Sequence, residues 1–393
     1  MAKECFDLPD DVLVQVLLLL PTSSRRRFRL VCKRWHDLID ERTPERQSRT
    51  KILTFFAERG EFRALVFDDE GGGGRRRAWT FPCSTATATI DIVGTCNGLL
   101  CLHETSPSSS INAGSSSVIS VTNPITGETR VLPPLPTQSQ RESARFGKYS
   151  FGYHPITGEY KVVHIPCRRR QEVDVVSVFT LGADTTSWRE VPVTAPGASY
   201  SDYCRSEVVS VDGVMYWLTA ATNRIMELDL GDERVTWLDV PPPVRADLTP
   251  EKGGRWRLTS VHARLGIAAT TSCDGVEVWV LDGRPRWARG RTLPEPPGHH
   301  GSSSWIKVPR LTYGEYAVTV SESWLWGSGR RRTRLYRHKV GSLIGHEGDD
   351  GRLLPPLPEG VAELVMDEDG GTPYHSEMKT FAYVETLEPL PGY

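Results

Sequence analysis

The eight cysteines of this 393-residue chain have no Cys-x-x-Cys spacing and no local clustering. A disulfide framework or a zinc site would need such a pattern, so the cysteines favour reduced thiols in a cytosolic or nuclear protein. Long apolar runs are also lacking, because residues 12–20 include Gln15 and are too short to cross a bilayer. No basic start of a signal peptide precedes them. We therefore expect a soluble protein of the cytoplasm and/or nucleus, without a membrane partner.

An excess of basic charge is missing as well. Lys and Arg number 47 against 49 Asp and Glu, which gives a formal net charge of −2. A general nucleic-acid binder needs a basic excess to neutralise phosphates, so we expect no specific nucleic-acid partner. Three arginine runs, at 75–77, 168–170 and 330–332, lie beside loop-like sequence, and we expect them to be solvated loops.

Sequence signatures of catalysis are few. The chain contains no Gly-x-Ser-x-Gly elbow, no phosphate-binding Walker loop and no His-Glu-x-x-His. Asp367 begins a stretch like a calcium loop, but its twelfth position is Met378 instead of Glu, which excludes an EF-hand. His299 and His300 have no third ligand at a suitable spacing. We expect no catalytic residue, no metal and no cofactor.

The N-terminal stretch from Leu8 to Ile39 predicts two short helices. Pro9 suits a first helical turn, the acidic residues after it favour the positive end of the helix dipole, and Pro21 ends the helix. Ser23 or Ser24 can cap the second helix. The expected apolar stripes are Val12, Leu13, Val16, Leu17 and Leu20, widened by Leu18 and Leu19, and then Phe28, Val31, Trp35, Leu38 and Ile39. About forty residues cannot bury both stripes, so leftover apolar surface should bind a partner.

These residues resemble the F-box of plant F-box proteins, through Leu8-Pro9, Leu13, Leu17, Leu20-Pro21, Phe28-Arg29, Val31 to Trp35 and Leu38-Ile39. In that family the module binds the adaptor Skp1, which joins it to a cullin-RING ubiquitin ligase. The resemblance therefore implies candidate Skp1 contacts at Leu8, Pro9, Leu13, Val16, Leu17, Pro21, Phe28, Val31 and Trp35. The alternative is a helical hairpin that only packs on the following domain.

The chain departs from the family pattern at Arg25 to Arg27, where leucines are usual. Arg25 stands one helical turn before Phe28. Its aliphatic stem could cover apolar surface while its charged head reaches water or an acidic partner.

From Lys51 onward, short β-branched and aromatic runs alternate with turn residues, which predicts an all-β domain rich in hairpins. Strand-like runs end in prolines whose first members stand at 82, 133, 192, 241, 294 and 355, spaced 49 to 61 residues apart. Propeller blades repeat roughly every 40–50 residues, and longer loops would stretch that period. We therefore predict a β-propeller of six blades, with seven as the alternative.

Two segments are near copies, Asn123 to Glu128 and His154 to Glu159, and each is expected to be a hairpin turn. Together with residues 94–101, 151–153, 211–217 and 225–230 they resemble the F-box-associated domain of plant F-box proteins. The expected organisation is an F-box at 1–41, a linker at 42–50 and an F-box-associated β-propeller at 51–393.

Tryptophans are the most informative aromatic residues of the β domain. Trp188 and Trp237 each stand four residues before a proline stop, and the repeated placement predicts packing between blades. Trp324 and Trp326 are alternate strand residues that share a face, and they precede Arg330. Because Trp and Arg are enriched at binding hot spots, these three are candidate contacts for a target protein.

The resemblance implies the substrate-recognition subunit of an SCF-type ubiquitin ligase. Its β domain would hold a target near the ubiquitin-loaded enzyme and act by effective concentration, with no catalytic side chain of its own. Two alternatives stay open. One is a β-propeller enzyme or sugar-binding protein with an incidental hairpin, and the other is a Skp1-bound scaffold that acts without ubiquitylation.

Overall fold

The computed structural model describes the chain in a helical part and a β part. The described residues are 8–20, 24–25, 28, 31–42, 51–58, 61–67, 76–106, 116–136, 147–166, 174–182, 187–193, 208–218, 224–241, 256–261, 264–270, 275–281, 286–294, 305–313, 316–325, 330–339, 363–366 and 379–391.

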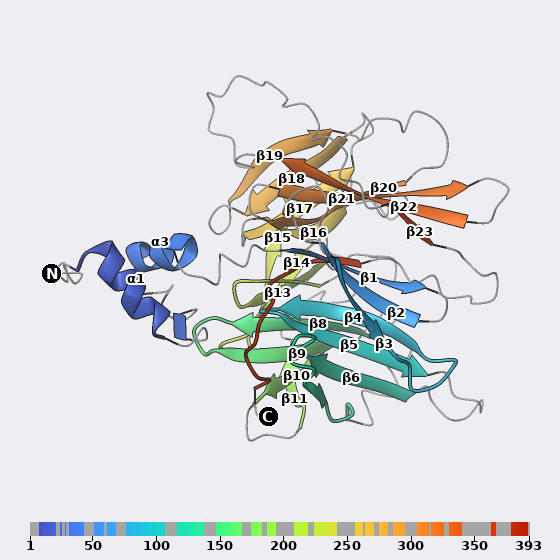
Figure 1. The fold of residues 1–393 in the computed structure, drawn as a ribbon, viewed down its shortest axis with the longest axis horizontal. Helices are drawn as coiled ribbons and strands as arrows, with labels where there is room; N and C mark the ends of the chain where they lie inside the picture. The colour runs from blue at the N-terminus through green and yellow to red at the C-terminus, as the bar shows by residue number, and fades with distance from the viewer. Residues whose placement is uncertain are drawn as a thin grey trace.

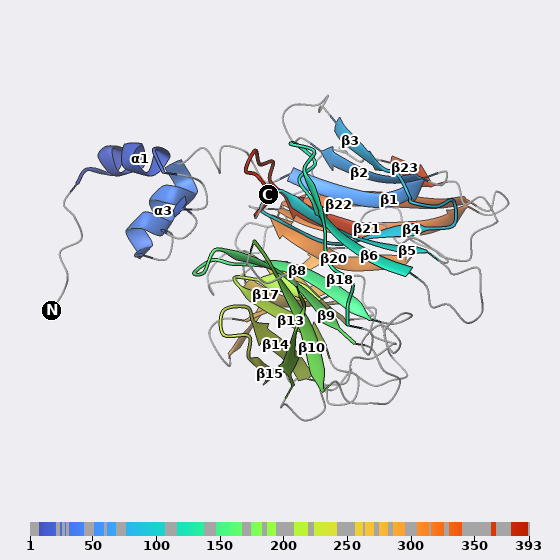
Figure 2. The same cartoon turned by 90° about the horizontal axis from the view of Figure 1, so that it is seen from below.

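Two helices, α1 (Asp10–Leu18) and α3 (Lys33–Arg42), lie side by side and to one side of the β domain (Figures 1 and 2). As predicted, α1 begins directly after Pro9, whose carbonyl accepts hydrogen bonds from the N–H groups of Val12 and Leu13 at 3.0 and 3.1 Å. Neither described helix is long and apolar enough to cross a membrane.

The second predicted helix differs from the observed one. Instead of running without a break from Ser23 or Ser24, the chain makes a turn at Val31 before α3 begins at Lys33. The N–H of Val31 donates to the carbonyl of Phe28 at 3.1 Å, three residues back. Such an i to i−3 bond tightens the last turn of a helical segment, which explains the break. Pro21 lies outside the described residues.

In the part of the chain that the structure describes, twenty-four strands form six four-stranded antiparallel sheets. The first three sheets contain β24 (Lys379–Tyr383), β1 (Lys51–Glu58), β2 (Glu61–Phe67) and β3 (Arg76–Phe81); β4 (Thr89–Cys96), β5 (Leu99–Ser106), β6 (Ser116–Thr122) and β7 (Thr129–Val131); and β8 (Lys148–His154), β9 (Glu159–Ile165), β10 (Val175–Leu181) and β11 (Arg189–Pro192).

The other three sheets follow the same order along the chain. They contain β12 (Val209–Val211), β13 (Val214–Leu218), β14 (Arg224–Asp229) and β15 (Val235–Asp239); β16 (Trp256–Val261), β17 (Arg264–Thr270), β18 (Gly275–Leu281) and β19 (Trp287–Pro294); and β20 (Trp305–Tyr313), β21 (Tyr316–Leu325), β22 (Arg330–Lys339) and β23 (Glu363–Met366).

The six sheets form a closed ring, which makes the domain a β-propeller. The first strand of each sheet contacts the first strand of the next, in the order β4, β8, β12, β16, β20, β24 and back to β4. Pairing of β24 with β1 closes the ring, with Leu53 opposite Phe381 and Lys51 opposite Tyr383. The prediction of a helical module followed by an all-β propeller is therefore confirmed.

The apolar core is divided into layers between neighbouring sheets. Leu53 of the first sheet and Ile92 of the second share one cluster, and Val163 of the third shares another with Trp217 of the fourth. Further clusters lie between the second and third sheets and between the fourth and fifth. The second, third and fourth sheets share such a cluster with a neighbour on each side, so their inner strands, such as β9 and β10, read as nearly continuous apolar runs.

Turn chemistry agrees with the sequence. The near copies Asn123 to Glu128 and His154 to Glu159 join β6 to β7 and β8 to β9, and Gly127 and Gly158 adopt φ values of 79° and 73° there. Such positive φ values favour glycine. In both turns the glycine N–H donates to the carbonyl of the first turn residue, at 2.9 and 2.8 Å. Both hairpin predictions are confirmed.

Five of the six proline stops lie at the end of a sheet's fourth strand. Pro82, Pro133 and Pro241 follow β3, β7 and β15, whereas Pro192 and Pro294 are the last residues of β11 and β19. An edge strand tolerates proline because one row of its N–H groups needs no partner. The sixth stop, at 355, lies outside the described residues.

Two arginine runs are strands, where the sequence predicted loops. Arg330 to Arg332 open β22, and Arg76 and Arg77 open β3. The loop prediction rested on local charge alone. In the structure β22 pairs with β21 and β3 pairs with β2, and this pairing decides the conformation of both runs. The run at 168–170 lies outside the described residues.

Trp188 packs between sheets as predicted, but Trp237 does not. Trp188 is buried, and its Nε1 donates to the carbonyl of Pro133 after β7 at 2.7 Å. Trp237 is partly exposed on β15, with the guanidinium of Arg224 3.8 Å above its ring. Trp287 is the counterpart of Trp188, because its Nε1 donates to the carbonyl of Asp239 at 3.0 Å. The proline spacing missed it because Trp287 begins β19.

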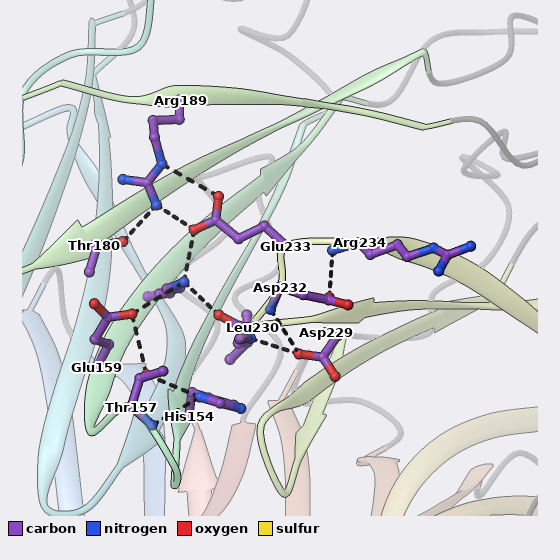
Figure 3. Close-up of polar contacts among 12 residues, drawn as sticks. His154, Thr157, Glu159, Thr180, Arg189, Asp229, Leu230, Asp232, Glu233 and Arg234 are labelled. Carbon is purple, nitrogen blue, oxygen red and sulfur yellow. Dashed lines mark hydrogen bonds and ion pairs between the residues drawn. The ribbon is translucent and has the colours of Figure 1, made fainter.

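A polar joint connects the third and fourth sheets (Figure 3). The ammonium of Lys161, almost fully buried on β9, donates to the carbonyl of Leu230 at 2.5 Å and to the Glu233 carboxylate at 2.8 Å. Arg189 of β11 also donates to Glu233. Burial raises the pKa of Glu233, but hydrogen bonds from Arg189 and Lys161 outweigh it and leave the pKa below its ordinary value.

We predict that Glu233→Gln destabilises the β domain by about 2 kcal/mol, somewhat less than the roughly 3–5 kcal/mol for breaking a fully buried pair. The variant leaves the buried Lys161 ammonium without its main anionic partner. Glu159→Gln is the matched control, since Glu159 contacts the same ammonium at 3.4 Å from an exposed position and should cost at most about 1 kcal/mol. Urea unfolding measures both variants, since a shift of the midpoint at an unchanged slope reports the change in unfolding free energy. Equal losses of stability in the two variants would contradict the prediction.

Candidate docking surface on the helical module

Helix α1 has two different apolar faces. Leu13, Val14 and Leu17 are buried and form a small core with Leu38 and Ile39 of α3. Phe28 and Trp35 pack against this core and contact each other edge to face, with ring centroids 5.4 Å apart. The hairpin therefore holds itself together with one face of α1.

The other face of α1 presents an exposed apolar stripe formed by Leu8, Val12, Val16 and Leu19, with exposed fractions of 39%, 44%, 43% and 86%. Steps of four, four and three residues place these side chains on one side of a helix. Val31, at the turn before α3, is also exposed. We call these five residues the apolar stripe.

Ion pairs fix the ends of the hairpin. The guanidinium of Arg34 donates to the Asp10 carboxylate at 2.7 and 2.9 Å and to the carbonyl of Leu8 at 2.6 Å. Arg42 pairs with Asp11. These bonds connect the first turn of α1 to both ends of α3. They therefore fix the position of the helix that carries the apolar stripe. In both figures the hairpin lies beside the β domain without being enclosed by it.

The structure separates the residues predicted to contact an adaptor. Leu8, Pro9, Val16 and Val31 are exposed, Phe28 and Trp35 are partly buried, and Leu13 and Leu17 are in the hairpin core. Pro21 lies outside the described residues. The sequence analysis placed Val12 and Leu19 in the apolar stripe of the first helix but not among the candidate adaptor contacts, although their spacing from Leu8 and Val16 was the available signal.

Arg25 is buried, instead of reaching water with its charged head. Its exposed fraction is 8%, and Nε and Nη1 have no hydrogen-bond partner among the residues that the structure describes. The chain departs from the leucine-rich family pattern at this position. A charged side chain is therefore buried where the family usually has an apolar one.

The predicted target contacts lie in the sixth sheet. Trp324 is in β21 and Arg330 opens β22, where their Cα partners across the ladder are Arg331 and Leu325. Trp324 and Arg330 therefore belong to two neighbouring residue pairs at the end of the β21–β22 hairpin. Trp326 lies outside the described residues.

A buried cluster of ionisable rings lies between the second and third sheets. The Tyr149 ring on β8 contacts His103 of β5 and His164 of β9, with centroids 4.7 and 4.8 Å apart. Nε2 of His103 bonds to the Ser117 hydroxyl at 2.7 Å. Burial lowers the pKa of His103 to about 4 and that of His164 to about 3, and raises that of Tyr149 to about 12.

This cluster serves the fold. At neutral pH both imidazoles are uncharged, and both ring nitrogens of His164 are buried with no partner in the described part of the chain. A general acid or base needs an accessible proton, which such rings do not offer. No group of three His, Cys, Asp or Glu side chains capable of holding a metal occurs among the described residues.

Comparison with known families agrees with this geometry. Residues 5–46 match the F-box domain, and residues 74–308 match the F-box associated beta propeller domain. The first match covers the helical module, and the second covers β3 to β19 and the start of β20, with β1, β2 and β21 to β24 outside it.

Relatives in Arabidopsis thaliana cover most of the chain. An F-box/LRR-repeat protein is 28% identical over 382 residues, covering 92% of this chain and 83% of its own. A putative F-box protein is 26% identical over 371 residues, covering 89% and 76%. Among solved structures, a chain of the nidogen/laminin complex covers 72% of this chain and 88% of its own at 12% identity, but its TM-score of 0.38 supports no conclusion.

We predict that the buried histidines make the β domain sensitive to acid. Because their pKa values fall on folding, the unfolded chain binds protons that the folded chain excludes, and stability decreases as the pH falls below 6.5. Each histidine should remove about 1.4 kcal/mol per pH unit between 6.5 and about 4. His164→Phe should flatten the pH dependence of unfolding free energy, whereas Trp188→Phe, a change in the same cluster without a titrating group, should not. Equal slopes for both variants and the wild type would contradict this.

Proposed function

We propose that this chain, which belongs to the family of plant F-box proteins with an F-box associated β-propeller domain, is the substrate-recognition subunit of an SCF-type ubiquitin ligase. The helical module docks on a Skp1-like adaptor and, through it, on a cullin-RING ligase. The β domain binds a target protein. The observation that carries the proposal is the apolar stripe on a module that the family match identifies as an F-box.

The stripe has the properties of a docking surface. Its valines and leucines stay exposed although the same helix buries Leu13 and Leu17 completely, so the module has already used the face that its own folding needs. Exposed, contiguous apolar side chains on a soluble module are typical of protein interaction sites. Val12, Val16 and Leu19 are the contacts we assign to the adaptor, with Leu8, Pro9 and Val31 at their margin.

The β domain is a rigid platform for the target. We take each four-stranded sheet as one blade, which gives a six-bladed propeller. The hairpin joining β8 and β9 lies on the side of the ring nearest the helices (Figure 1). First strands of all blades end on that side, so second strands, including β21, end on the opposite side. Trp324 and Arg330 therefore belong to the side away from the adaptor.

Such an arrangement suits a receptor without catalytic groups. The adaptor and the target occupy opposite sides of one rigid body, and ubiquitin transfer is accelerated because the target is held at high effective concentration near the ligase. We place this activity in the cytoplasm and/or nucleus, where reduced cysteines persist. Among the described cysteines, Cys83 and Cys101 are free thiols.

We predict that a Val12→Asp, Val16→Asp double variant loses about a hundredfold in affinity for purified Skp1. Each valine should contribute roughly 1.5 kcal/mol or more of apolar burial at the interface, and 1.4 kcal/mol corresponds to a tenfold change. Surface plasmon resonance with immobilised adaptor measures the affinity, and circular dichroism checks that the helices persist.

The matched control is Val131→Asp, which places the same charge at an exposed valine of β7 and should leave adaptor affinity unchanged. Equal binding by the double variant and the wild type would contradict the docking surface. Failure of the wild type to bind any Skp1-like adaptor would overturn the whole proposal.

Target identification needs the intact complex. We expect proteins recovered with the wild-type chain from plant cells, with the proteasome blocked, to accumulate in cells that express the double variant. A partner that binds the β domain but keeps the same lifetime in both cells would favour the scaffold alternative.

A further inference from the structure

The last described residues, 384–391, follow β24 as an extended segment without strand pairing. We call them the C-terminal strap. Asn123, fully buried at the start of the β6–β7 turn, donates from its side-chain amide to the carbonyls of Thr386 and Glu388 at 3.2 and 2.9 Å. The same side chain accepts from the N–H of Ile125 at 2.9 Å. The turn therefore fixes the amide in the orientation that binds the strap.

Two more side chains of the same hairpin hold the strap backbone. The Glu128 carboxylate accepts from the N–H of Leu390 at 2.8 Å, and Arg130 donates to the carbonyl of Pro391 at 2.9 Å. Gly98, at a φ of 84°, permits the close approach, because a Cβ there would lie 2.5 Å from the carbonyl oxygen of Val384. The hairpin thus contacts main-chain groups from Thr386 to Pro391, and Gly98, between β4 and β5, adjoins the start of the strap.

One side chain anchors the strap in the core. Leu390 is 2% exposed and belongs to the cluster of Phe151, Phe179 and Trp188, which lies between the second and third sheets. Leu387, three residues earlier, is 80% exposed. Proteins that bind extended peptides often use the same combination, in which main-chain hydrogen bonds give affinity and a pocket for a side chain gives specificity.

The strap also reaches the junction with the helical module. Glu385 pairs with Lys51, the first residue of β1, at 3.2 Å and with Arg77 of β3 at 3.4 Å. Figure 2 shows the C-terminal segment beside β1. A docked strap therefore connects the closing sheet to the second and third sheets at this junction.

We propose that the β6–β7 hairpin and the Leu390 pocket form a binding site for an extended peptide with a leucine between two prolines, and that the chain's own C-terminal strap occupies it. Covalent attachment gives the strap a high effective concentration, so it fills the site in the intact chain. Docked, it locks the ring and fixes the entry of β1. This proposal does not depend on adaptor binding.

The test uses a fluorescent peptide of residues 384–393 and the full-length chain. The wild-type chain should not bind the peptide, because its own strap occupies the site. The full-length Leu390→Asp variant, whose strap cannot dock, should bind it. A peptide with Leu390→Asp should bind this variant at least about tenfold more weakly, since it loses the burial of a leucine. A peptide with Leu387→Asp should bind as well as the unchanged peptide. Fluorescence anisotropy measures all four, and absence of peptide binding by a folded Leu390→Asp chain would overturn the proposal.

A second variant covers the case in which Leu390→Asp does not fold. Asn123→His converts the first turn into the sequence of its near copy, where His154 Nδ1 accepts from the N–H of Thr157 at 3.2 Å. The turn should persist while the two amide donors to the strap are lost. Hydrogen exchange of residues 384–391 should become at least about tenfold faster, and exchange in β14 should stay unchanged. Unchanged exchange of the strap would also overturn the proposal.

Discussion

Closure of the ring is the constraint on which the rest of the structure depends. Neighbouring sheets share apolar clusters from the first sheet to the fifth, so each of these sheets depends on its neighbours to bury its apolar side chains. The joint is the pairing of β1 with β24, which brings Leu53 beside Phe381 across more than 300 residues. Such a long closure costs chain entropy. Buried Leu53 and Tyr383 at the joint, and the strap that follows it, offset that cost.

The helical module remains outside this ring, and its surface chemistry follows from that separation. Adjacent residues of α1 differ sharply: Leu17 is fully buried against α3, and Val16 is 43% exposed. The two described helices, α1 and α3, cover one face of each other. The apolar residues on the other face of α1 lie away from this core, and exposed apolar side chains of this kind are typical of protein interaction sites.

Much of the β domain was predictable because its signals are local. The Gly127 and Gly158 turns need only nearby residues, and proline stops mark edge strands whose N–H groups are free. Short edge strands such as β7 (Thr129–Val131) and β23 (Glu363–Met366) have three and four residues, too few to show a periodicity of their own. On α1 the sequence grouped Val12 with Leu13, because a continuous apolar run does not reveal which side α3 covers.

The two near-copy turns show where sequence reasoning stops. Asn123-Pro-Ile-Thr-Gly-Glu and His154-Pro-Ile-Thr-Gly-Glu form the same hairpin, and their first residues stabilise it in the same way, by accepting an N–H from within the turn. The amide group of Asn123 also carries N–H donors, and these bond to carbonyls 263 and 265 residues away. A local pattern explains the accepted bond in both turns. The donated bonds exist because ring closure brings the end of the chain beside the second sheet, so a single side chain acquires its role from the global fold.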